Sequence, residues 1–280
     1  ELTLDCGNGQ TLKLISFPAG EFMMGSPEQL PAQSLSTRGG FQLGYDPTPA
    51  PPNEQPQHKV RITKPFYLGI FTVTQAQYEA LMGANPSRYK GANRPVEMVS
   101  WSDAVAFCKK LSAKTGRQVR LPTEAEWENA CRAGTTGPWY TSEILSTKQA
   151  NIRDYWGWAE SEEYHSTAPV GSYPPNPWGL YDMLGNVKQW CQDWYTGGYY
   201  KMSPVDDPTG PVEGEGIKPA HVARGGGWDG AVGECRSAIR MDPITPFTER
   251  DWTKGFRVVC VGTPEEIKNA PPAKELEAFV

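Results

Sequence analysis

Apolar and polar side chains alternate along residues 11 to 24, where the apolar positions are Leu12, Leu14, Phe17, Phe22 and Met24. A period of two residues is typical of strands that bury one face. The turn-forming segment Pro18-Ala-Gly20 interrupts this pattern, so the sequence predicts a hairpin over residues 11–24. Residues 58–62 and 66–70 have similar patterns and are also predicted to be strands.

Three helices are predicted from start signals followed by apolar positions at helical spacing. Two of them begin with a capping box, in which Thr is followed three residues later by Gln or Glu. Glu124 and Glu126 in the third helix could serve acid–base chemistry, but carboxylates at this position also stabilise the positive end of a helix. The latter interpretation is favoured. The expected helices run from Thr74 to Gly83, from Ser102 to Gly116 with Val105, Cys108 and Leu111 inside, and onward from Thr123.

Regular periodicity fades after Gly134, and long irregular stretches separate short strand-like pieces at 168–173, 221–224 and 256–261. Residues 25–57 are rich in Pro, Gly, Ser and Gln, which predicts a long loop. No internal repeat and no obvious linker divides the chain. The pattern therefore favours one domain with little regular secondary structure.

Composition narrows the class of protein. The 280 residues include 29 Gly, 26 Pro and 10 Trp, which favours a loop-rich globule with aromatic anchors. The net charge is −5, and no Lys/Arg cluster stands out, so nothing suggests nucleic-acid binding. No apolar run approaches the length of a membrane span.

Four phrases spread along the chain resemble the formylglycine-generating enzyme family, also called the sulfatase-modifying-factor domain. Two shorter phrases, Phe22–Ser26 and Phe66–Ile70, agree with it. The resemblance covers roughly residues 13 to 262 and depends on the order of the phrases rather than on any one of them. The four are Arg120–Trp127, Trp178–Asn186, Arg224–Trp228 and Gly255–Val259.

This resemblance implies an α+β fold, the formylglycine-generating-enzyme variant of the C-type-lectin-like architecture. We expect an N-terminal segment over residues 1–12, a single domain over 13–262 that contains the long loop 25–57, and a C-terminal tail over 263–280.

The resemblance also implies structural calcium, because the family binds this ion with oxygen ligands at two places. The second place lacks a carboxylate that the family has, since Gln189 follows Lys188 in this chain. One site is therefore expected more than two. The matching ligands are Asn151, Ile152, Glu162 and Tyr164 at the first place, with Glu160 or Glu163 as alternatives to Glu162, and Asp182, Gly185 and Val187 at the second.

Active members of the family hold Cu(I) between two thiolates five residues apart, as soft thiolates select this ion. The matching segment here runs from Gly225 to Arg240 and contains only Cys235. Counted from the glycine run, the first thiolate position falls on Gly230. The sequence thus predicts that copper is not bound and that formylglycine is not formed.

The six cysteines have a structural interpretation through the same resemblance. It implies two long-range disulfides, Cys131 with Cys235 and Cys108 with Cys260. Disulfides are typical of oxidising compartments, and a removed signal peptide is one explanation of the start at Glu1, as is a shortened chain. We therefore expect a secreted, periplasmic or envelope-associated protein.

Candidate ligand contacts gather in the segments that line the family's substrate cleft. An aromatic plate with guanidinium groups can hold a carboxylate, a phosphate or an aromatic ring, although Arg240 and Arg257 could equally tie loops to backbone carbonyls. Three alternative functions are compatible with these observations. The chain is a non-catalytic module that binds another protein or a small ligand, an oxidoreductase with altered chemistry as in pyoverdine maturation, or a true formylglycine-generating oxidase. The first alternative is favoured. The candidates are Trp228, Asp229, Arg236, Arg240 and Arg257.

Overall fold

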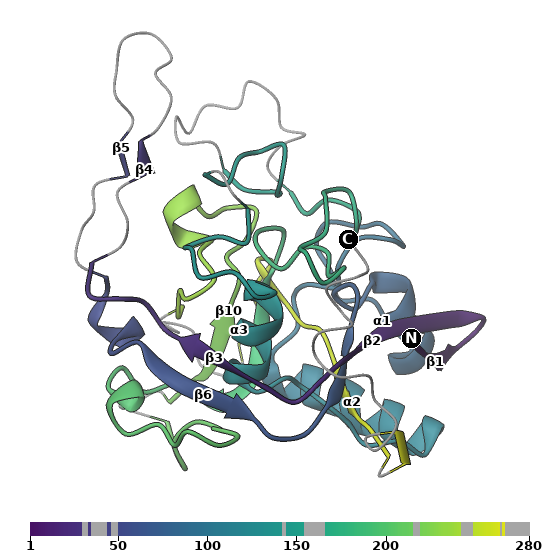
Figure 1. Cartoon of the computed structure of the whole chain (residues 1–280). Coiled ribbons are helices and arrows are strands. Elements are labelled where there is room, and N and C mark those ends of the chain that lie inside the picture. Colours follow the sequence, from purple (N-terminus) through teal and green to yellow (C-terminus); the bar gives the residue numbers. More distant parts are fainter. Residues whose placement is uncertain are drawn as a thin grey trace, which may run out of the picture.

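An antiparallel sheet of five strands organises the computed structural model (Figure 1). Its strand order is β1-β2-β7-β12-β8, and every neighbouring pair is antiparallel. The strands are β1 (Leu2–Gly7), β2 (Gln10–Phe17), β7 (Phe66–Gly69), β12 (Val259–Val261) and β8 (Val119–Arg120). The structure describes residues 1–29, 33–34, 44–45, 50–141, 144–153, 166–214, 219–241, 249–263 and 265–266.

Both faces of the three central strands, β2, β7 and β12, contribute to the core. Phe17, Leu68 and Val259 belong to one hydrophobic cluster, while Leu14 and Cys260 belong to a second. Successive side chains of a strand point to opposite faces, so these strands contribute to both clusters, whereas the buried side chains of the outer strands β1 and β8 belong to the second alone. Helices α1 (Gln75–Met82) and α2 (Trp101–Thr115) cover the face of the second cluster.

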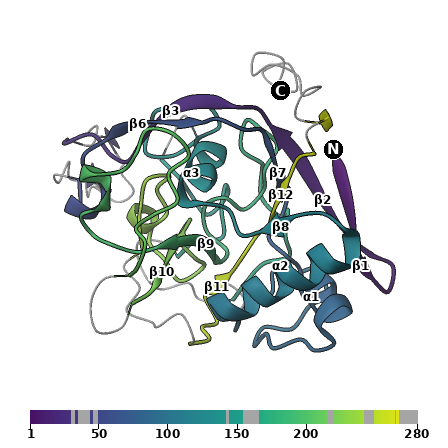
Figure 2. The ribbon, with the colours of Figure 1, turned by 90° about the horizontal axis from the view of Figure 1, so that it is seen from below.

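Helix α3 (Glu124–Arg132) lies in the middle of the molecule, between two smaller sheets (Figure 2). On one side are the antiparallel strands β3 (Gly20–Met24) and β6 (His58–Ile62). On the other side is the sheet β10-β9-β11, made of His221–Arg224, Lys188–Trp194 and Lys254–Gly255. All nine residues of α3 are buried.

The remaining elements are short. Within residues 25–57, the two-residue strands β4 and β5 pair with each other, and one 3-10 turn, η1, ends the segment. Two more 3-10 turns follow strands β9 and β10 in sequence. These elements are β4 (Gln33–Ser34), β5 (Gly44–Tyr45), η1 (Pro52–Glu54), η3 (Tyr199–Lys201) and η4 (Val232–Glu234). Among the described residues, none of the helices is long and apolar enough to cross a membrane.

The helix predictions are confirmed, with one correction. The capping boxes of α1 and α3 form at Thr74 and Thr123 as expected. Helix α2 begins two residues earlier than predicted, because Ser100 and not Ser102 is its N-cap. The side chain of Asp103 accepts from the Ser100 backbone N–H at 2.9 Å, which completes a third capping box.

The predicted hairpin over residues 11–24 is wrong. Strands β2 and β3 do not pair with each other, because β2 lies between β1 and β7 while β3 pairs with β6. Residues 168–173 form turns rather than a strand. Residues 1–12, which were expected to form a separate N-terminal segment, supply the edge strand β1 and the start of β2.

A network of buried ion pairs surrounds α3. Glu124 binds the Arg240 guanidinium through two contacts of 2.7 and 3.1 Å. Glu128 accepts from Arg224 and, at 2.8 Å, from Arg132. Burial opposes the ionisation of Glu128, but the two arginines outweigh it and keep its pKa below the usual range. These charges are therefore retained in the core as compensated pairs.

Arg224 connects α3 to the chain that follows strand β10. Its guanidinium is fully buried and also donates to the carbonyls of Ser237, Ala238 and Ile239. Substitution Arg224→Met would leave these carbonyls and part of Glu128 without donors. We expect it to lower the free energy of unfolding by about 3–5 kcal/mol, the usual cost of breaking a buried pair, measured by urea denaturation at neutral pH.

The matched control is Arg61→Met. Arg61 pairs with Asp206 at 2.6 Å, but both side chains are about half exposed, so its loss should cost about 1 kcal/mol or less. Equal effects of the two substitutions would contradict a structural role for the buried network.

Candidate functional site

A tight glycine turn leads into the candidate site. Gly225 follows strand β10 with a φ of 95°, and a Cβ at this position would lie 2.7 Å from the carbonyl oxygen of Met183 and 3.0 Å from the ring of Trp127. Only glycine fits such a left-handed backbone against a neighbouring indole. The run Gly225–Gly227 thus lets the chain pass Trp127 and deliver Trp228 to the surface.

Aromatic and basic side chains from three distant segments meet at Trp228. The Tyr89 ring contacts Trp228 edge to face, with centroids 5.6 Å apart. Arg88 lies over both Tyr89 and Trp252, at 5.6 and 4.7 Å from the ring centroids. Trp252 is 44% exposed. We call this group, with Lys188 and Asp229, the Trp228 surface.

The Trp228 surface contains one ion pair and one unsatisfied donor. Lys188 Nζ lies 3.2 Å from both carboxylate oxygens of Asp229 and 3.3 Å from the hydroxyl of Thr253. The buried Nε1–H of Trp228 has no hydrogen-bond partner among the described residues. Such a donor costs free energy unless a ligand or water accepts from it.

The three candidate arginines do not belong to this surface. Arg236 forms a bidentate pair with Glu54, with both contacts at 2.7 Å, and Arg240 pairs with Glu124. Arg257 donates to Gln189 and to the carbonyls of Gly69, Ile70 and Tyr181. All three are buried. The structure favours the alternative in which Arg240 and Arg257 tie segments together, and it extends that role to Arg236.

Part of the first candidate calcium site can be described. The amide nitrogen of Asn151 donates to the carbonyl of Ser166 at 2.9 Å and to the side chain of Asn186 at 3.3 Å. Its side-chain oxygen accepts no hydrogen bond within the described part of the chain, which leaves an oxygen of the kind that calcium prefers. Ile152 follows directly, whereas Glu162 and Tyr164 lie outside the described residues.

The second candidate site lies beside the first. A Cβ at Gly185 would be 2.5 Å from the carbonyl oxygen of Asn151. Asp182 accepts from the Gly171 N–H at 2.8 Å, and burial raises its pKa to about 6. Gln189, which takes the place of the family carboxylate, donates to the Asp182 carbonyl and accepts from Trp127 and Arg257. Its amide thus fills this place with hydrogen bonds, and the structure places Val187, the remaining candidate, in the core.

All six cysteines are buried free thiols in the structure. Cys131 and Cys235 share one core cluster, and Cys108 and Cys260 share the other. The structure thus differs from the expected disulfides, and the two pairings stay predictions. A Cβ at Gly230 would lie 3.5 Å from the sulfur of Cys235. Burial raises the pKa of the Cys235 thiol to about 12, which keeps it protonated at neutral pH.

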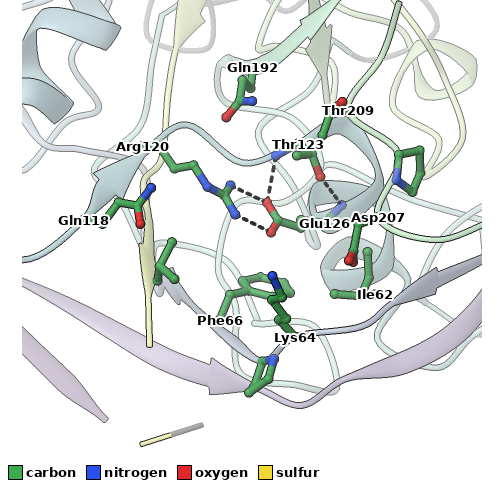
Figure 3. Close-up of a pocket in the computed structure, with 13 residues that line it drawn as sticks. Ile62, Lys64, Phe66, Gln118, Arg120, Thr123, Glu126, Gln192, Asp207 and Thr209 are labelled. Atoms are coloured by element: carbon green, nitrogen blue, oxygen red, sulfur yellow. Dashed lines mark hydrogen bonds and ion pairs between the residues drawn. The ribbon is translucent and has the colours of Figure 1, made fainter. Parts of the chain in front are cut away.

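Two cavities are well defined by described residues. One, of about 440 Å³, opens beside the N-terminus of α3 (Figure 3). The other, of about 400 Å³, lies between β3 and the C-terminal end of α3. The Trp228 surface contributes to neither of them.

The fold and the four phrases define a formylglycine-generating-enzyme-like domain with a modified site. The family described as sulfatase-modifying factor enzyme 1-like domain matches residues 7–261, and this chain belongs to it. The formylglycine-generating enzyme of Streptomyces coelicolor is 32% identical over an alignment of 272 positions. The match covers 76% of this chain and 78% of that protein.

Two solved structures are similar over nearly the whole chain. Treponema denticola variable protein 1 is 26% identical with a TM-score of 0.74, and the match covers 93% of this chain and 99% of that one. PvdO from Pseudomonas aeruginosa is 28% identical with a TM-score of 0.73, and the match covers 93% and 98%.

Sequence reasoning found Trp228 and Asp229 but missed the residues around them. Arg88, Tyr89 and Trp252 come from loops whose proximity no local pattern reveals. Adjacent basic and aromatic residues, as in Arg88-Tyr89, were the one available signal. From the sequence, Lys188 was noted only as the residue before Gln189, whereas its side chain pairs with Asp229 in the structure.

Proposed function

We propose that this protein is a non-catalytic member of its family, secreted or periplasmic, that binds a protein or a small ligand at the Trp228 surface. One observation carries the proposal. The segment that matches the family's copper site, Gly225–Arg240, contains Cys235 as its one cysteine, and this thiol is buried with its pKa raised by burial to about 12. Soft thiolates select Cu(I), and a single buried thiol does not supply the pair that active members of the family use.

The Trp228 surface has the features of a recognition site. Exposed aromatic rings and an arginine are the side chains that contribute most to binding energy, and here Trp252 and Arg88 stack against each other at the surface. The indole N–H of Trp228 offers one donor to a ligand acceptor. Lys188 and Asp229 neutralise each other at 3.2 Å, so ligand binding need not depend on net charge.

An oxidoreductase with altered chemistry is the second candidate. The likeness to PvdO over 98% of that chain favours it. Such an activity would use the same surface with no thiolate pair. A true formylglycine-generating oxidase is the third candidate and requires a second thiol from elsewhere in the chain.

We also propose a structural calcium ion at Asn151 and Ile152. The side-chain oxygen of Asn151 supports this site, because it accepts no hydrogen bond from the described residues and calcium prefers oxygen ligands of this kind. Gln189 makes a second ion at Asp182 less favourable, as a neutral amide replaces a carboxylate.

The first test is anaerobic titration with Cu(I), followed by X-ray absorption. We expect no stoichiometric copper bound by two sulfurs, since the matching segment contains a single cysteine, and no oxygen consumption with a cysteine-containing peptide. The variant Cys235→Ser should behave as the wild type does. One copper per chain with two sulfur ligands, lost in Cys235→Ser, would establish the oxidase instead.

A second test addresses the Trp228 surface. Purified from its source, the protein should retain a stoichiometric partner or ligand, and Trp252→Ala should release it because this substitution removes the ring against which Arg88 stacks. Met202→Ala is the control, since Met202 is 78% exposed in a different segment. Isolation of the protein alone, with turnover of a small aromatic substrate, would support the oxidoreductase.

Calcium is tested by melting temperature. Removal of calcium with EDTA should lower the melting temperature of the wild type, and added calcium should restore it, because an ion that binds only the folded state stabilises it. The variant Asn151→Ala should melt lower and lose the response. Identical melting in EDTA and in calcium would remove this proposal while leaving the assignment of the Trp228 surface intact.

A further inference from the structure

The cavity beside the N-terminus of α3 has no role in the family assignment or in the proposed function. It is formed where the β6–β7 connection, strand β8, strand β9 and the loop around Thr209 converge (Figure 3). Its volume of about 440 Å³ is within the range of about 300–1,000 Å³ typical of small-molecule sites. Gln192 lies four residues beyond Lys188 on β9, so the cavity is about 13 Å along the strand from the Trp228 surface.

Three of the four charged groups of the lining are satisfied by the protein. Arg120 and Glu126 form a bidentate pair with contacts of 2.6 and 2.7 Å in the centre of the view. Glu126 also accepts from the Thr123 N–H at 2.8 Å. Asp207 accepts from the backbone N–H and the hydroxyl of Thr63. With Lys64, the lining contains two cations and two anions, so it offers no net charge to an ionic ligand.

The uncharged polar groups of the lining have hydrogen-bonding capacity left. The side-chain amides of Gln118 and Gln192 and the hydroxyl of Thr209 make no hydrogen bond within the described part of the chain, and all three line the cavity. An amide presents two donors and one acceptor oxygen, and a hydroxyl can do either. Groups of this kind match a ligand whose own groups both donate and accept.

Apolar side chains complete the lining. Pro65 and Val261 contribute partly exposed carbon surface next to the polar groups, whereas Ile62 and Phe66 are only 3% and 2% exposed. A ligand that combines hydroxyl groups on its edges with C–H faces would satisfy both parts of the lining. A purely apolar ligand would leave the two amides unpaired, which is unfavourable.

We propose that this cavity binds a neutral saccharide unit. Gln118 and Gln192 hydrogen-bond its hydroxyl groups from two sides, Thr209 adds a third polar contact, and Pro65 and Val261 contact its C–H face. The Arg120–Glu126 pair is a positioning element that keeps strand β8 and the start of α3 in place, because Glu126 also completes the capping box of that helix.

The test is an NMR titration of the isotope-labelled full chain with the methyl glycosides of glucose, galactose, mannose and N-acetylglucosamine. We expect at least one of them to bind in the millimolar range and to shift resonances of the cavity residues. Methyl glucuronide should bind no more tightly than methyl glucoside, because the lining has no net charge.

Two variants connect binding to the cavity. Gln118→Ala and Gln192→Ala should each weaken binding about fivefold, the usual contribution of one neutral hydrogen bond, without changing the melting temperature. Gln10→Ala is the matched control, because Gln10 starts strand β2 and is not part of this lining. The absence of any shift at millimolar glycoside, or equal binding by all three variants and the wild type, would overturn the proposal.

Discussion

The α3 helix is buried on every side, yet four of its nine residues are charged. Burying a charge is costly unless a partner and hydrogen bonds compensate it. Arg132, Arg224 and Arg240 provide that compensation from within the helix and from strand β10 and the chain after it. Arg224 and Arg240 therefore hold strand β10 and the chain after it against α3, since their guanidinium groups pair with Glu128 and Glu124.

This constraint explains how the candidate arginines are used within the core. Arg236 is used to anchor Glu54, which closes the long segment after strand β3. Arg240 bridges Glu124 to the carbonyls of Asn53 and Thr196. These guanidinium groups hold distant segments together in the core. The Trp228 surface is built instead from aromatic rings, the Arg88 guanidinium and the Lys188–Asp229 ion pair.

Local signals were enough to predict some elements. The capping boxes at Thr74 and Thr123 involve residues three positions apart, so the sequence contains the whole interaction. The start of the second helix was predicted two residues too late because Ser100 and Ser102 offer equivalent hydroxyls, and the partner Asp103 favours Ser100.

Strand pairing was mispredicted because, unlike a capping box, it depends on residues far away in the sequence. The turn at Pro18-Ala-Gly20 is compatible with a hairpin, and the pairing of β2 with β7 and of β3 with β6 depends on residues 34 to 55 positions away.

The order of the four phrases established the family and the fold, and the residues between Gly225 and Arg240 established that one thiol is present where active members have two. Both properties depend only on short stretches of the sequence. Only the tertiary structure distinguishes arginines that form ion pairs in the core from side chains that lie at the surface. Arg236 is 182 positions from its partner Glu54 in the sequence, and Arg240 is 116 positions from its partner Glu124. The neighbours of Trp228 and the cavity beside α3 likewise exist only where distant segments pack together. Long-range contacts of this kind follow from the burial of the whole chain, which no short stretch of sequence contains.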